Sequence, residues 1–573
     1  MTTGIQPGGD RTIVSASAHS AETISQEVGP LGFSGSTVLR NGFAGSIWTV
    51  VARLIGFGRT ITVGAVLGVT YLGNTYQSIN SLPNLVYYQL LAGSLFAALL
   101  IPPLVRHLDR HDEPAAQRLV QGVFGTFLTC AVALSAILVA IGPFVMRLVT
   151  IGVSDPGIAA AQRRVGWLFL VMFVPQITLY LVAGTGAAVM NARGRFALAA
   201  AAPALESLGM IAVMVAAWVT FRTETGLLHI SDAQLLLLGL GTTAAVGAHA
   251  TCQWLGARSS GIIIRPRWAW RDDEVTQLLR RALPMLAFSC LEALQIFAVI
   301  VVSNRIRGGV VAFQLALNLF FLPTAIITWP IARALLPQLT KWHSDQEPDR
   351  FHEELVRAVS IASFVTVPIA AAYVAFAWPI ARVIAFGRLH EAGGVGLIAP
   401  SIAALALAVV GETWFILATY GCYARHDVRT PLRCMVVRVG VALAFMTLAM
   451  FSHGRTVLVL LGLSLSIGSV AGAIRMGWRL RDQLPSSGPS MARSVGGTAL
   501  MSVLMVLPAV LVMLIFGEIT SSKLLQVTEL AGLLLLSAGI YVSFQLMRGA
   551  PEIAWLKSTF IRRDNDGGRG DGP

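Results

Sequence analysis

The chain has 573 residues, of which 55% are hydrophobic and only 12% are charged, and its mean hydropathy is +0.70. A soluble protein of this size carries about a quarter charged residues. This composition therefore excludes an ordinary soluble protein and predicts an all-α polytopic membrane protein. The formal net charge is +13. The arginines fall in short clusters between apolar runs, which is typical of cytoplasmic loops and argues against a nucleic-acid partner.

The predicted elements begin with a polar segment, 1–43, which we expect to be disordered and cytoplasmic. It lacks the hydrophobic region of a cleavable signal peptide, so targeting is expected to come from the first span. About 14 membrane spans follow, with ends uncertain by several residues. They are predicted near 44–70, 76–105, 119–149, 165–190, 197–221, 233–256, 282–303, 310–339, 356–385, 395–423, 432–452, 456–478, 494–517 and 526–547.

An internal repeat divides these spans. Glu113-Pro114 recurs as Glu347-Pro348, and Ala192-Arg193 recurs as Ala424-Arg425, 232 positions later (425 − 193). Because six spans is an even number, two such halves have the same orientation and form a parallel repeat. We therefore expect two pseudo-symmetric six-helix lobes around a central cavity. The predicted domains are an N-lobe (44–257), a basic cytoplasmic linker (258–281), a C-lobe (282–480), two C-terminal spans (481–548) and a cytoplasmic tail (549–573).

The basic residues of the connections predict the orientation. Placing both termini inside puts about 27 Lys and Arg residues on the inner side and about 8 on the outer side. We therefore predict a multi-pass protein of the cytoplasmic membrane with both termini in the cytoplasm.

Ionisable residues within the spans are the candidate functional groups, because a charge in hydrocarbon usually faces a cavity or a protein partner. Arg53 and Arg59 lie in the first span, where they could bind phosphate or reach the interface. Glu206, Glu292 and Glu412 are the acidic candidates. Each could bind a coupling cation (H+ or Na+) or pair with an intramembrane arginine, and Glu292 and Glu412 are the preferred coupling or gating residues.

Other polar residues mark the second half. Arg305 follows the seventh span, where it could close a cavity or mark the interface. Gln314 and Asn318 are four residues apart and share one helical face, which lines a cavity or joins two helices. The sequence has no catalytic constellation, no metal-ligand spacing and no cofactor motif, so we expect neither an enzyme nor a metal site.

Several segments in chain order carry a family resemblance: "ARLIGFGR", "LPNL", "NARGRFALAAAAPAL", "LFFLPTAIITWPIARALLPQL" and "YARHDVRTP". Together they resemble the MurJ/MviN family of lipid II flippases, in the superfamily that also holds multidrug exporters and polysaccharide flippases. The resemblance implies a fourteen-helix transporter with a cationic cavity that moves a polyprenyl-diphosphate-linked peptidoglycan precursor to the outer leaflet. It also implies a groove for the lipid tail at the last two spans.

The resemblance assigns substrate-binding roles to individual residues. Arg53 and Arg59 match family arginines and would bind diphosphate, Asn84 matches the motif asparagine, and Arg305 matches a family arginine. The chain departs from the family at other positions. Tyr87-Tyr88 replace an arginine pair, Ala92 replaces a glutamate, Asn74 replaces an aspartate, and Asn318 replaces an arginine. Tyr87, Tyr88 and Asn84 would contact sugar or peptide.

Three other functions stay open. The chain could flip another lipid-linked glycan, or it could export drugs in exchange for cations. It could also be a transport-inactive scaffold for cell-wall synthesis. Expected partners are lipid II or a related precursor and membrane lipids, with cell-wall synthesis and division proteins as further candidates.

Overall fold

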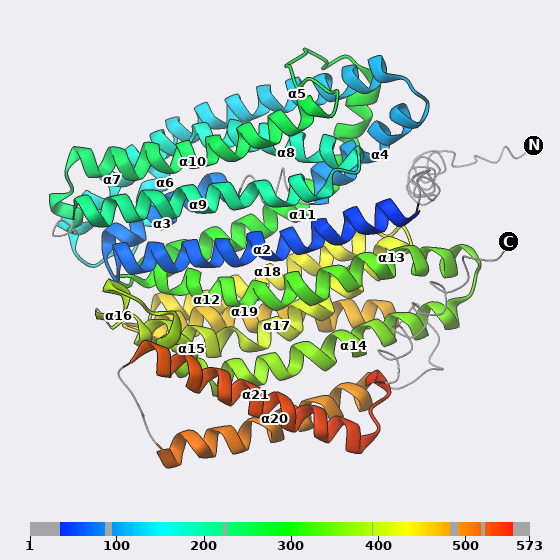
Figure 1. Ribbon diagram of the computed structural model, residues 1–573. Helices are drawn as coiled ribbons and strands as arrows, with labels where there is room; N and C mark the ends of the chain where they lie inside the picture. Colours follow the sequence, from blue (N-terminus) through cyan, green and yellow to red (C-terminus); the bar gives the residue numbers. More distant parts are fainter. Residues whose placement is uncertain are drawn as a thin grey trace, which may run out of the picture.

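The computed structural model describes residues 35–85, 94–221, 226–391, 393–481, 491–516 and 522–553. Every regular element in these ranges is helical (Figure 1), in agreement with the predicted fold class. The elements are α2 Gly35–Leu67, α3 Tyr71–Leu85, α4 Ser94–Asp109, α5 Glu113–Ala140, α6 Gly142–Val149, α7 Pro156–Phe173, α8 Pro175–Ala192, α9 Phe196–Thr220, η2 Leu227–His229, α10 Asp232–Ser259, α11 Asp273–Ser303, α12 Gly309–Pro323, η3 Thr324–Thr328, α13 Trp329–Ser344, α14 Pro348–Ala375, α15 Ala377–Ile384, α16 Arg388–Glu391, α17 Val395–Ala424, α18 Arg429–Met450, α19 Thr456–Arg481, α20 Met491–Phe516 and α21 Lys523–Arg548.

Thirteen segments among the described residues are long and apolar enough to cross a membrane. The predicted span near 76–105 corresponds to α3 and α4, and residues 86–93 between them lie outside the described ranges. Two other spans extend beyond their predicted ends near 165–190 and 310–339, and each continues through a proline. One joins α7 to α8 at Pro175, over Pro156–Ala192, and another joins α12, η3 and α13 over Gly309–Ser344.

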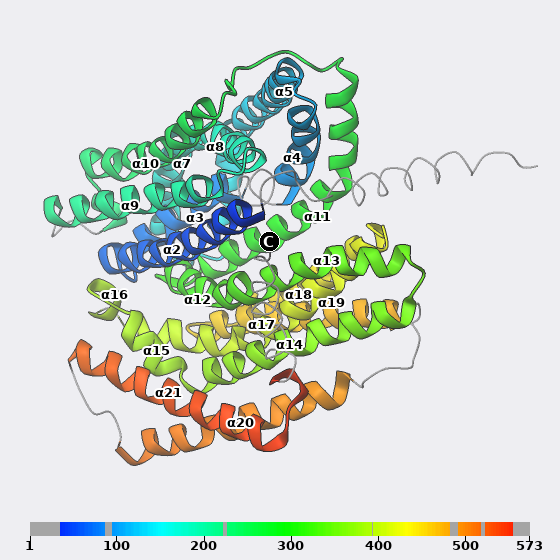
Figure 2. The same ribbon diagram turned by 45° about the vertical axis from the view of Figure 1, so that its right-hand side comes forward.

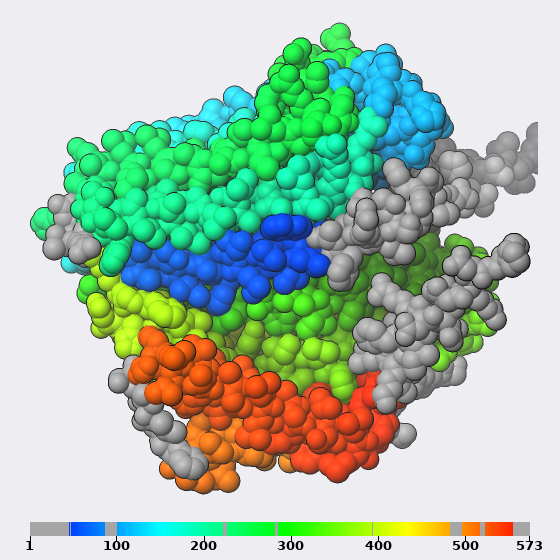
Figure 3. Space-filling view, viewed as in Figure 1, coloured from blue at the N-terminus to red at the C-terminus, as the bar shows by residue number. Residues whose placement is uncertain are grey.

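Helix packing falls into two groups. In the first, which we call the N-terminal bundle (α2 to α10), α9 packs against α2 and α10, and α8 packs against α10. In the second, the C-terminal bundle (α12 to α19), α17 packs against α19 and α14, and α18 packs against α19. Helix α11 contacts both groups, and α2 also touches α12 and α16. In the space-filling view α2 forms a blue stripe between the two groups, and α20 and α21 lie below (Figure 3).

Loop residues fix where the helices begin. Asp112 accepts a hydrogen bond from the Ala115 backbone N–H at 3.0 Å, and Pro114 occupies the first turn of α5. Asp155 accepts from the backbone N–H groups of Gly157 and Ile158 at the start of α7. An Asp cap followed by proline satisfies free N–H groups and pre-sets the helical φ angle. The two capping aspartates therefore start α5 and α7 before their apolar stretches begin.

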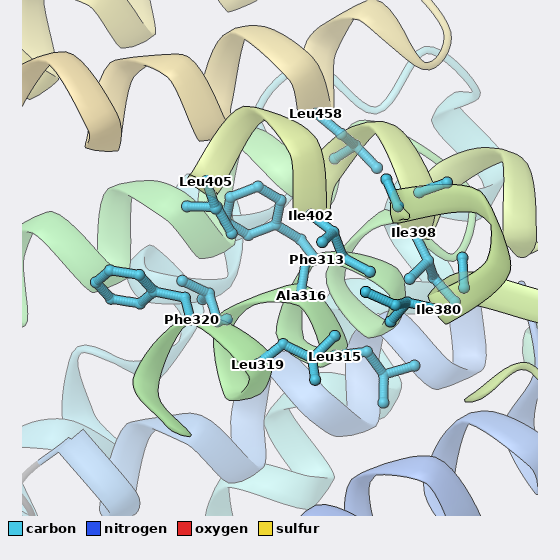
Figure 4. Packing of buried hydrophobic residues seen from close by; sticks show 14 of the residues in the cluster. Phe313, Leu315, Ala316, Leu319, Phe320, Ile380, Ile398, Ile402, Leu405 and Leu458 are labelled. Atoms are coloured by element: carbon cyan, nitrogen blue, oxygen red, sulfur yellow. The ribbon is translucent and has the colours of Figure 1, made fainter. Parts of the chain in front are cut away.

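The core of the C-terminal bundle is shown in Figure 4. Phe313 of α12 lies against Ile402 and Leu405 of α17, and Leu315 and Phe320 belong to the same buried cluster. Because lipid tails are as apolar as these side chains, close van der Waals packing rather than the hydrophobic effect holds helices together in a membrane. Large leucines also stay on the outer surface, including Leu514 of α20 and Leu535 of α21, which are 76% and 74% exposed.

Glycines allow the closest helix crossings. A Cβ added at Gly462 of α19 would lie 2.6 Å from the Ala404 Cβ, and one at Gly411 of α17 would lie 2.8 Å from the Val470 backbone N. Real Cβ atoms do not approach so closely, so the α17–α19 crossing depends on these two glycines. Small residues at such contacts are typical of membrane helices.

The span Gly309–Ser344 changes its winding in the middle. Residues Thr324–Thr328 form a π-helical turn between Pro323 and Pro330. Each proline removes a backbone donor, and the wider turn accommodates this loss. The Thr328 hydroxyl hydrogen-bonds the Thr413 hydroxyl at 3.0 Å, which ties the turn to α17.

Candidate functional site

A buried polar cluster joins four helices of the N-terminal bundle. Glu206 of α9 lies at its centre, with its side chain 4% exposed. Arg59 of α2 donates to Glu206 Oε1 at 3.2 Å, and Tyr180 of α8 donates to the same oxygen at 2.9 Å. His249 of α10, whose side chain is fully buried, contacts Glu206 Oε2 through Nδ1 at 3.0 Å. We call these four residues the Glu206 cluster.

Asn84 connects the cluster to α3. Its Oδ1 lies 2.7 Å from the Tyr180 hydroxyl, which shares its one hydrogen between Asn84 and Glu206. Its Nδ2 donates to the Asn80 carbonyl at 2.8 Å. Of the predicted substrate residues, Arg59 therefore contacts Glu206 directly, and Asn84 is connected to it through Tyr180. The predicted role of either residue in binding substrate stays a prediction.

Burial explains why these groups gather. An isolated charge inside a membrane protein is costly, and a carboxylate is tolerated there when donors and a cation surround it. Glu206 has three such donors. Arg59 is 20% exposed at its side chain, so its guanidinium is the least buried member of the ion pair. Of the two sequence interpretations of Glu206, the structure shows the pairing with an intramembrane arginine.

A second buried ion pair lies in the C-terminal bundle. Arg438 of α18 contacts Glu412 Oε2 of α17 at 2.7 Å, with side-chain exposures of 8% and 7%. The guanidinium also lies over the Phe415 ring, 5.2 Å from its centroid. Glu412 was predicted to be a coupling or gating residue. In this structure its carboxylate is paired with Arg438.

The two buried sites occupy equivalent positions in the repeat. The offset of 232 that matches Arg193 to Arg425 also matches Tyr180 to Glu412 (412 − 180) and Glu206 to Arg438 (438 − 206). In both bundles the two equivalent side chains touch: Tyr180 bonds Glu206, and Glu412 pairs with Arg438. The same helix crossing therefore holds a tyrosine–carboxylate pair in one bundle and a carboxylate–arginine pair in the other.

Polar contacts also join the two bundles at one end of the molecule, on the left in Figure 1 where α16 lies. Asn74 of α3 is fully buried there. Its Nδ2 donates to the Ile306 carbonyl at 2.8 Å, and its Oδ1 accepts from the Val310 backbone N–H at 3.1 Å. Val310 is in the first turn of α12, so one asparagine satisfies a free helix N–H and bridges the bundles.

Further bonds reinforce this junction. Asn304, at the end of α11, exchanges two amide hydrogen bonds with Gln162 of α7, at 3.1 and 3.2 Å. Arg388 of α16 donates to the Val66 carbonyl of α2 at 3.2 Å. Arg305 donates to the Ala449 carbonyl of α18 at 2.7 Å, within the second group of helices. We call the contacts of Asn74, Asn304 and Arg388 the end junction.

The remaining predicted residues lie elsewhere. Arg53 is exposed on α2, and Glu292 is half-buried on α11. Asn318 of α12 donates to the Gln314 carbonyl at 2.8 Å and approaches the Thr60 hydroxyl at 3.4 Å, so it faces α2 one residue from Arg59. Tyr87 and Tyr88 lie outside the described residues.

Sequence reasoning overlooked three residues of these sites: His249, Tyr180 and Arg438. His249 and Arg438 each lie inside a predicted span, and an ionisable residue within an apolar run was a sufficient signal. Tyr180 gave no such signal, because tyrosine is common in membrane helices. Among the described residues, no group of three or more His, Cys, Asp or Glu side chains could hold a metal ion.

The motif "YARHDVRTP" forms the turn between α17 and α18. Asp427 accepts hydrogen bonds from the backbone N–H groups of Arg429 and Thr430, at 3.0 and 2.9 Å. Partial burial by itself raises the pKa of Asp427, but hydrogen bonds from Thr430 and Arg429 outweigh it and hold the pKa below its usual value. The aspartate thus caps the first turn of α18.

Comparison with known proteins places this arrangement in a family. The profile of the family described as "Lipid II flippase MurJ" matches residues 63–534, which is most of the chain. The chain belongs to the lipid II flippase MurJ family. This confirms the family resemblance seen in the motifs.

Individual MurJ relatives are distant. The chain is 25% identical to a probable lipid II flippase MurJ of Rhizobium meliloti over 390 residues, covering 67% of this chain and 70% of the relative. It is 22% identical to the lipid II flippase MurJ of Burkholderia cenocepacia over 438 residues, covering 74% and 79%.

Solved structures share the fold. A lipid II flippase MurJ in an inward closed conformation aligns with a TM-score of 0.68 at 14% identity, covering 88% of this chain and 98% of that one. An inward-facing multidrug resistance MATE family transporter of the MOP superfamily aligns with a TM-score of 0.55, also at 14% identity, covering 81% and 98%.

Proposed function

We propose that the protein is a flippase that moves lipid II, a polyprenyl-diphosphate-linked peptidoglycan precursor, to the outer leaflet of the cytoplasmic membrane. The observation that carries this proposal is the match of the MurJ family profile over residues 63–534. The structure supports it with a partly exposed arginine, Arg59, on a helix that touches both bundles. The protein acts as a transporter, and its chemistry is binding and release.

Arg59 is the proposed anchor for the diphosphate. A guanidinium binds phosphate oxygens with two parallel hydrogen bonds. The hydrogen bond to Glu206 holds the guanidinium of Arg59 in place. Asn318, in the middle of the facing helix α12, approaches Thr60 and lies beside the same stretch of α2. Arg53, six residues earlier on α2, adds a second cation along the helix. Asn84, Tyr87 and Tyr88 are proposed to contact the sugar or peptide.

The end junction is proposed to be the closed gate of an alternating-access cycle. With both termini in the cytoplasm, the loops at α16 lie on the outer side, and the junction blocks exit there. Asn74 and Arg388 bridge the bundles by two hydrogen bonds and one, respectively. Asn304 holds the end of α11 against α6 and α7 by three hydrogen bonds. A net hydrogen bond contributes about 0.5–1.5 kcal/mol, so a few of them form a barrier that substrate binding energy can overcome.

Several finer points are proposals of the same kind. A cation, H+ or Na+, or the membrane potential drives the return step. The apolar surface of α20 and α21 receives the lipid tail, and proteins of cell-wall synthesis and division are candidate partners. The departures Tyr87-Tyr88 and Asn318 at family arginine positions favour a second candidate, a flippase for another lipid-linked glycan.

The test is replacement of the resident flippase in a bacterium that depends on it. Cells that express only this chain are treated with an external enzyme that degrades lipid II, and the degraded fraction measures lipid II in the outer leaflet. We expect the wild-type chain to restore outer-leaflet lipid II and Arg59→Ala to lose it. Arg455→Ala, which changes an exposed loop arginine, is the matched control and should behave as wild type.

Two outcomes would reject the assignment. Absence of outer-leaflet lipid II with a folded, membrane-inserted wild-type chain would reject lipid II as the cargo. Full activity of Arg59→Ala would reject the proposed anchor. Native mass spectrometry of the purified protein then distinguishes cargos, because lipid II and other polyprenyl-linked glycans differ in mass.

A further inference from the structure

The Glu206 cluster contains a histidine that lipid binding alone does not require. His249 lies on α10 with its side chain fully buried, and its Nδ1 is 3.0 Å from Glu206 Oε2. An ionised carboxylate only accepts hydrogen bonds, so Nδ1 must carry the hydrogen in this contact. The ring can then take a second proton on Nε2. Histidine is the side chain whose ordinary titration range lies nearest to physiological pH.

The net charge of the Glu206 cluster depends on whether His249 carries a second proton. The charged and titratable groups around the ring include Arg59 of α2, Tyr180 of α8 and Glu206 of α9. Tyr76 of α3 is buried nearby, where it bonds Thr242 of α10 and interacts electrostatically with Arg59 and Glu206. Helix α7 meets α10 away from the ring, through Met172 at Gly239. With neutral His249 the cluster has no net charge, because Arg59 balances Glu206. With protonated His249 its net charge is +1.

The Glu412–Arg438 pair of the C-terminal bundle differs from the Glu206 cluster in its charged groups. There the position of Glu206 is occupied by Arg438, a permanent cation that pairs with Glu412. A Cβ added at Gly472 of α19 would lie 2.9 Å from the Arg438 Cβ, so no side chain larger than glycine fits at that contact. Because arginine is a permanent cation, the C-terminal site contains a fixed positive charge, whereas the N-terminal site contains a titratable ring.

We propose that His249 and Glu206 form a proton-binding site whose occupancy controls the availability of Arg59 to an anionic diphosphate headgroup. Glu206 shares its negative charge between Arg59 and the ring. When the ring gains a proton, Glu206 is balanced by a second cation and holds Arg59 less strongly. The side chain of Arg59 is the most exposed of the ion pair, so it is the one that can turn toward a ligand between the bundles.

The coupling has a definite sign. A cluster with net charge +1 attracts an anion more strongly than a neutral cluster, so protonation of His249 tightens binding of the diphosphate. By thermodynamic reciprocity, binding of the diphosphate at Arg59 increases the affinity of His249 for its proton. The proton and the anionic headgroup therefore bind cooperatively. This linkage rests on the proposed function, whereas the proton site itself does not.

The proton site is tested first, without any ligand. The full-length protein is labelled with 15N-histidine, reconstituted into phosphatidylglycerol–phosphatidylcholine nanodiscs, and titrated from pH 5 to 9 by NMR. The resonance missing from His249→Gln identifies the ring, and His249→Asn provides the same assignment if the first variant does not fold. We expect this resonance to titrate, and its midpoint to move to lower pH in Glu206→Gln. His453→Gln, an exposed loop variant, should leave it unchanged.

The linkage is tested with a farnesyl diphosphate diester of N-acetylglucosamine, because a diphosphate diester does not itself titrate in this range. We expect the wild-type protein to bind it about tenfold more tightly at pH 5.5 than at pH 8.5, within the usual range of coupling energies. His249→Gln should bind it with the same affinity at both pH values.

Each result is decisive for one part. A His249 ring that stays in one protonation state from pH 5 to 9, or a midpoint that Glu206→Gln does not move, would overturn the proton site. Equal pH dependence in wild type and His249→Gln would overturn the linkage. A titrating His249 in a protein that does not bind the diester at any pH would reject the proposed function and support the proton site.

Discussion

Asn74 of α3 and Val310 of α12 are joined across the two bundles by a hydrogen bond of 3.1 Å from the Val310 backbone N–H to the Asn74 side-chain oxygen. The nitrogen of the same amide donates to the Ile306 carbonyl. One side chain therefore holds the start of α12 through two bonds. An aspartate, which the family resemblance implies at this position, could accept the first bond but could not donate the second.

The first prediction concerns this asparagine. Asn74→Leu removes both bonds and should shift the equilibrium toward a state open at this end, by about 1–3 kcal/mol. The measurement is the labelling rate of a cysteine that replaces Val69, a buried loop residue that lies against Gly308 at the junction. Ser452→Ala, whose hydroxyl bonds within its own helix, is the control. Equal labelling in Asn74→Leu and wild type would contradict the role of the end junction.

The second prediction concerns the buried pair Glu412–Arg438. Removing one partner leaves a buried charge unpaired, so Glu412→Gln and Arg438→Met should each lower the free energy of unfolding by about 3–5 kcal/mol. The double variant should be less destabilised than the sum of the two, because neither charge remains. A thermal double-mutant cycle in detergent measures this coupling. Strict additivity would show that the two side chains do not interact.

The third prediction compares two glycines of α19. Gly462→Ala places a methyl group 2.6 Å from the Ala404 Cβ and should destabilise the protein by about 1–3 kcal/mol through overpacking. Gly477→Ala is the matched control, because a Cβ there meets nothing within 4 Å. It should be neutral or stabilising, since alanine favours a helix. Equal melting temperatures for the two variants would show that the α17–α19 crossing tolerates the methyl group.

The fourth prediction concerns pH and Asp427. The pKa of Asp427 is lower in the folded protein than in the unfolded chain, where it is about 3.9. Its contribution to stability is therefore complete above that value and is lost as the pH falls through the folded-state pKa. Asp427→Ala should cost about 1 kcal/mol at pH 7, as for other helix caps. The difference in melting temperature should shrink toward pH 3, and a constant difference would contradict the capping role.

The sequence predicted the helical fold because a long apolar run has few alternatives in a membrane. Backbone groups in lipid must be bonded within their own segment, so such a run must be a helix. Asp112 and Asp155 placed before proline likewise indicate helix starts, because capping involves neighbours in the chain. Span lengths were predicted less well, since the span predicted near 165–190 covers Pro156–Ala192 in the structure.

The partner of each polar side chain was harder to predict, because it depends on which helices become neighbours. Arg59 and Glu206 are 147 residues apart, and Arg305 lies 144 residues from the carbonyl that it bonds. A polar residue in a span predicts that a partner exists but does not identify it. Glu412 was therefore a candidate for coupling, although its neighbour Arg438 lies in the next predicted span.

By itself, the sequence determined the class of protein, its helical character and the family, because these depend on composition and on neighbours along the chain. The tertiary structure decided the rest. It brought His249, Tyr180 and Arg59 around one carboxylate, placed Arg438 at the equivalent position of the second bundle, and joined the bundles at Asn74. The physical reason is that a buried charge is tolerated only where distant helices supply its partners, and packing alone selects those helices.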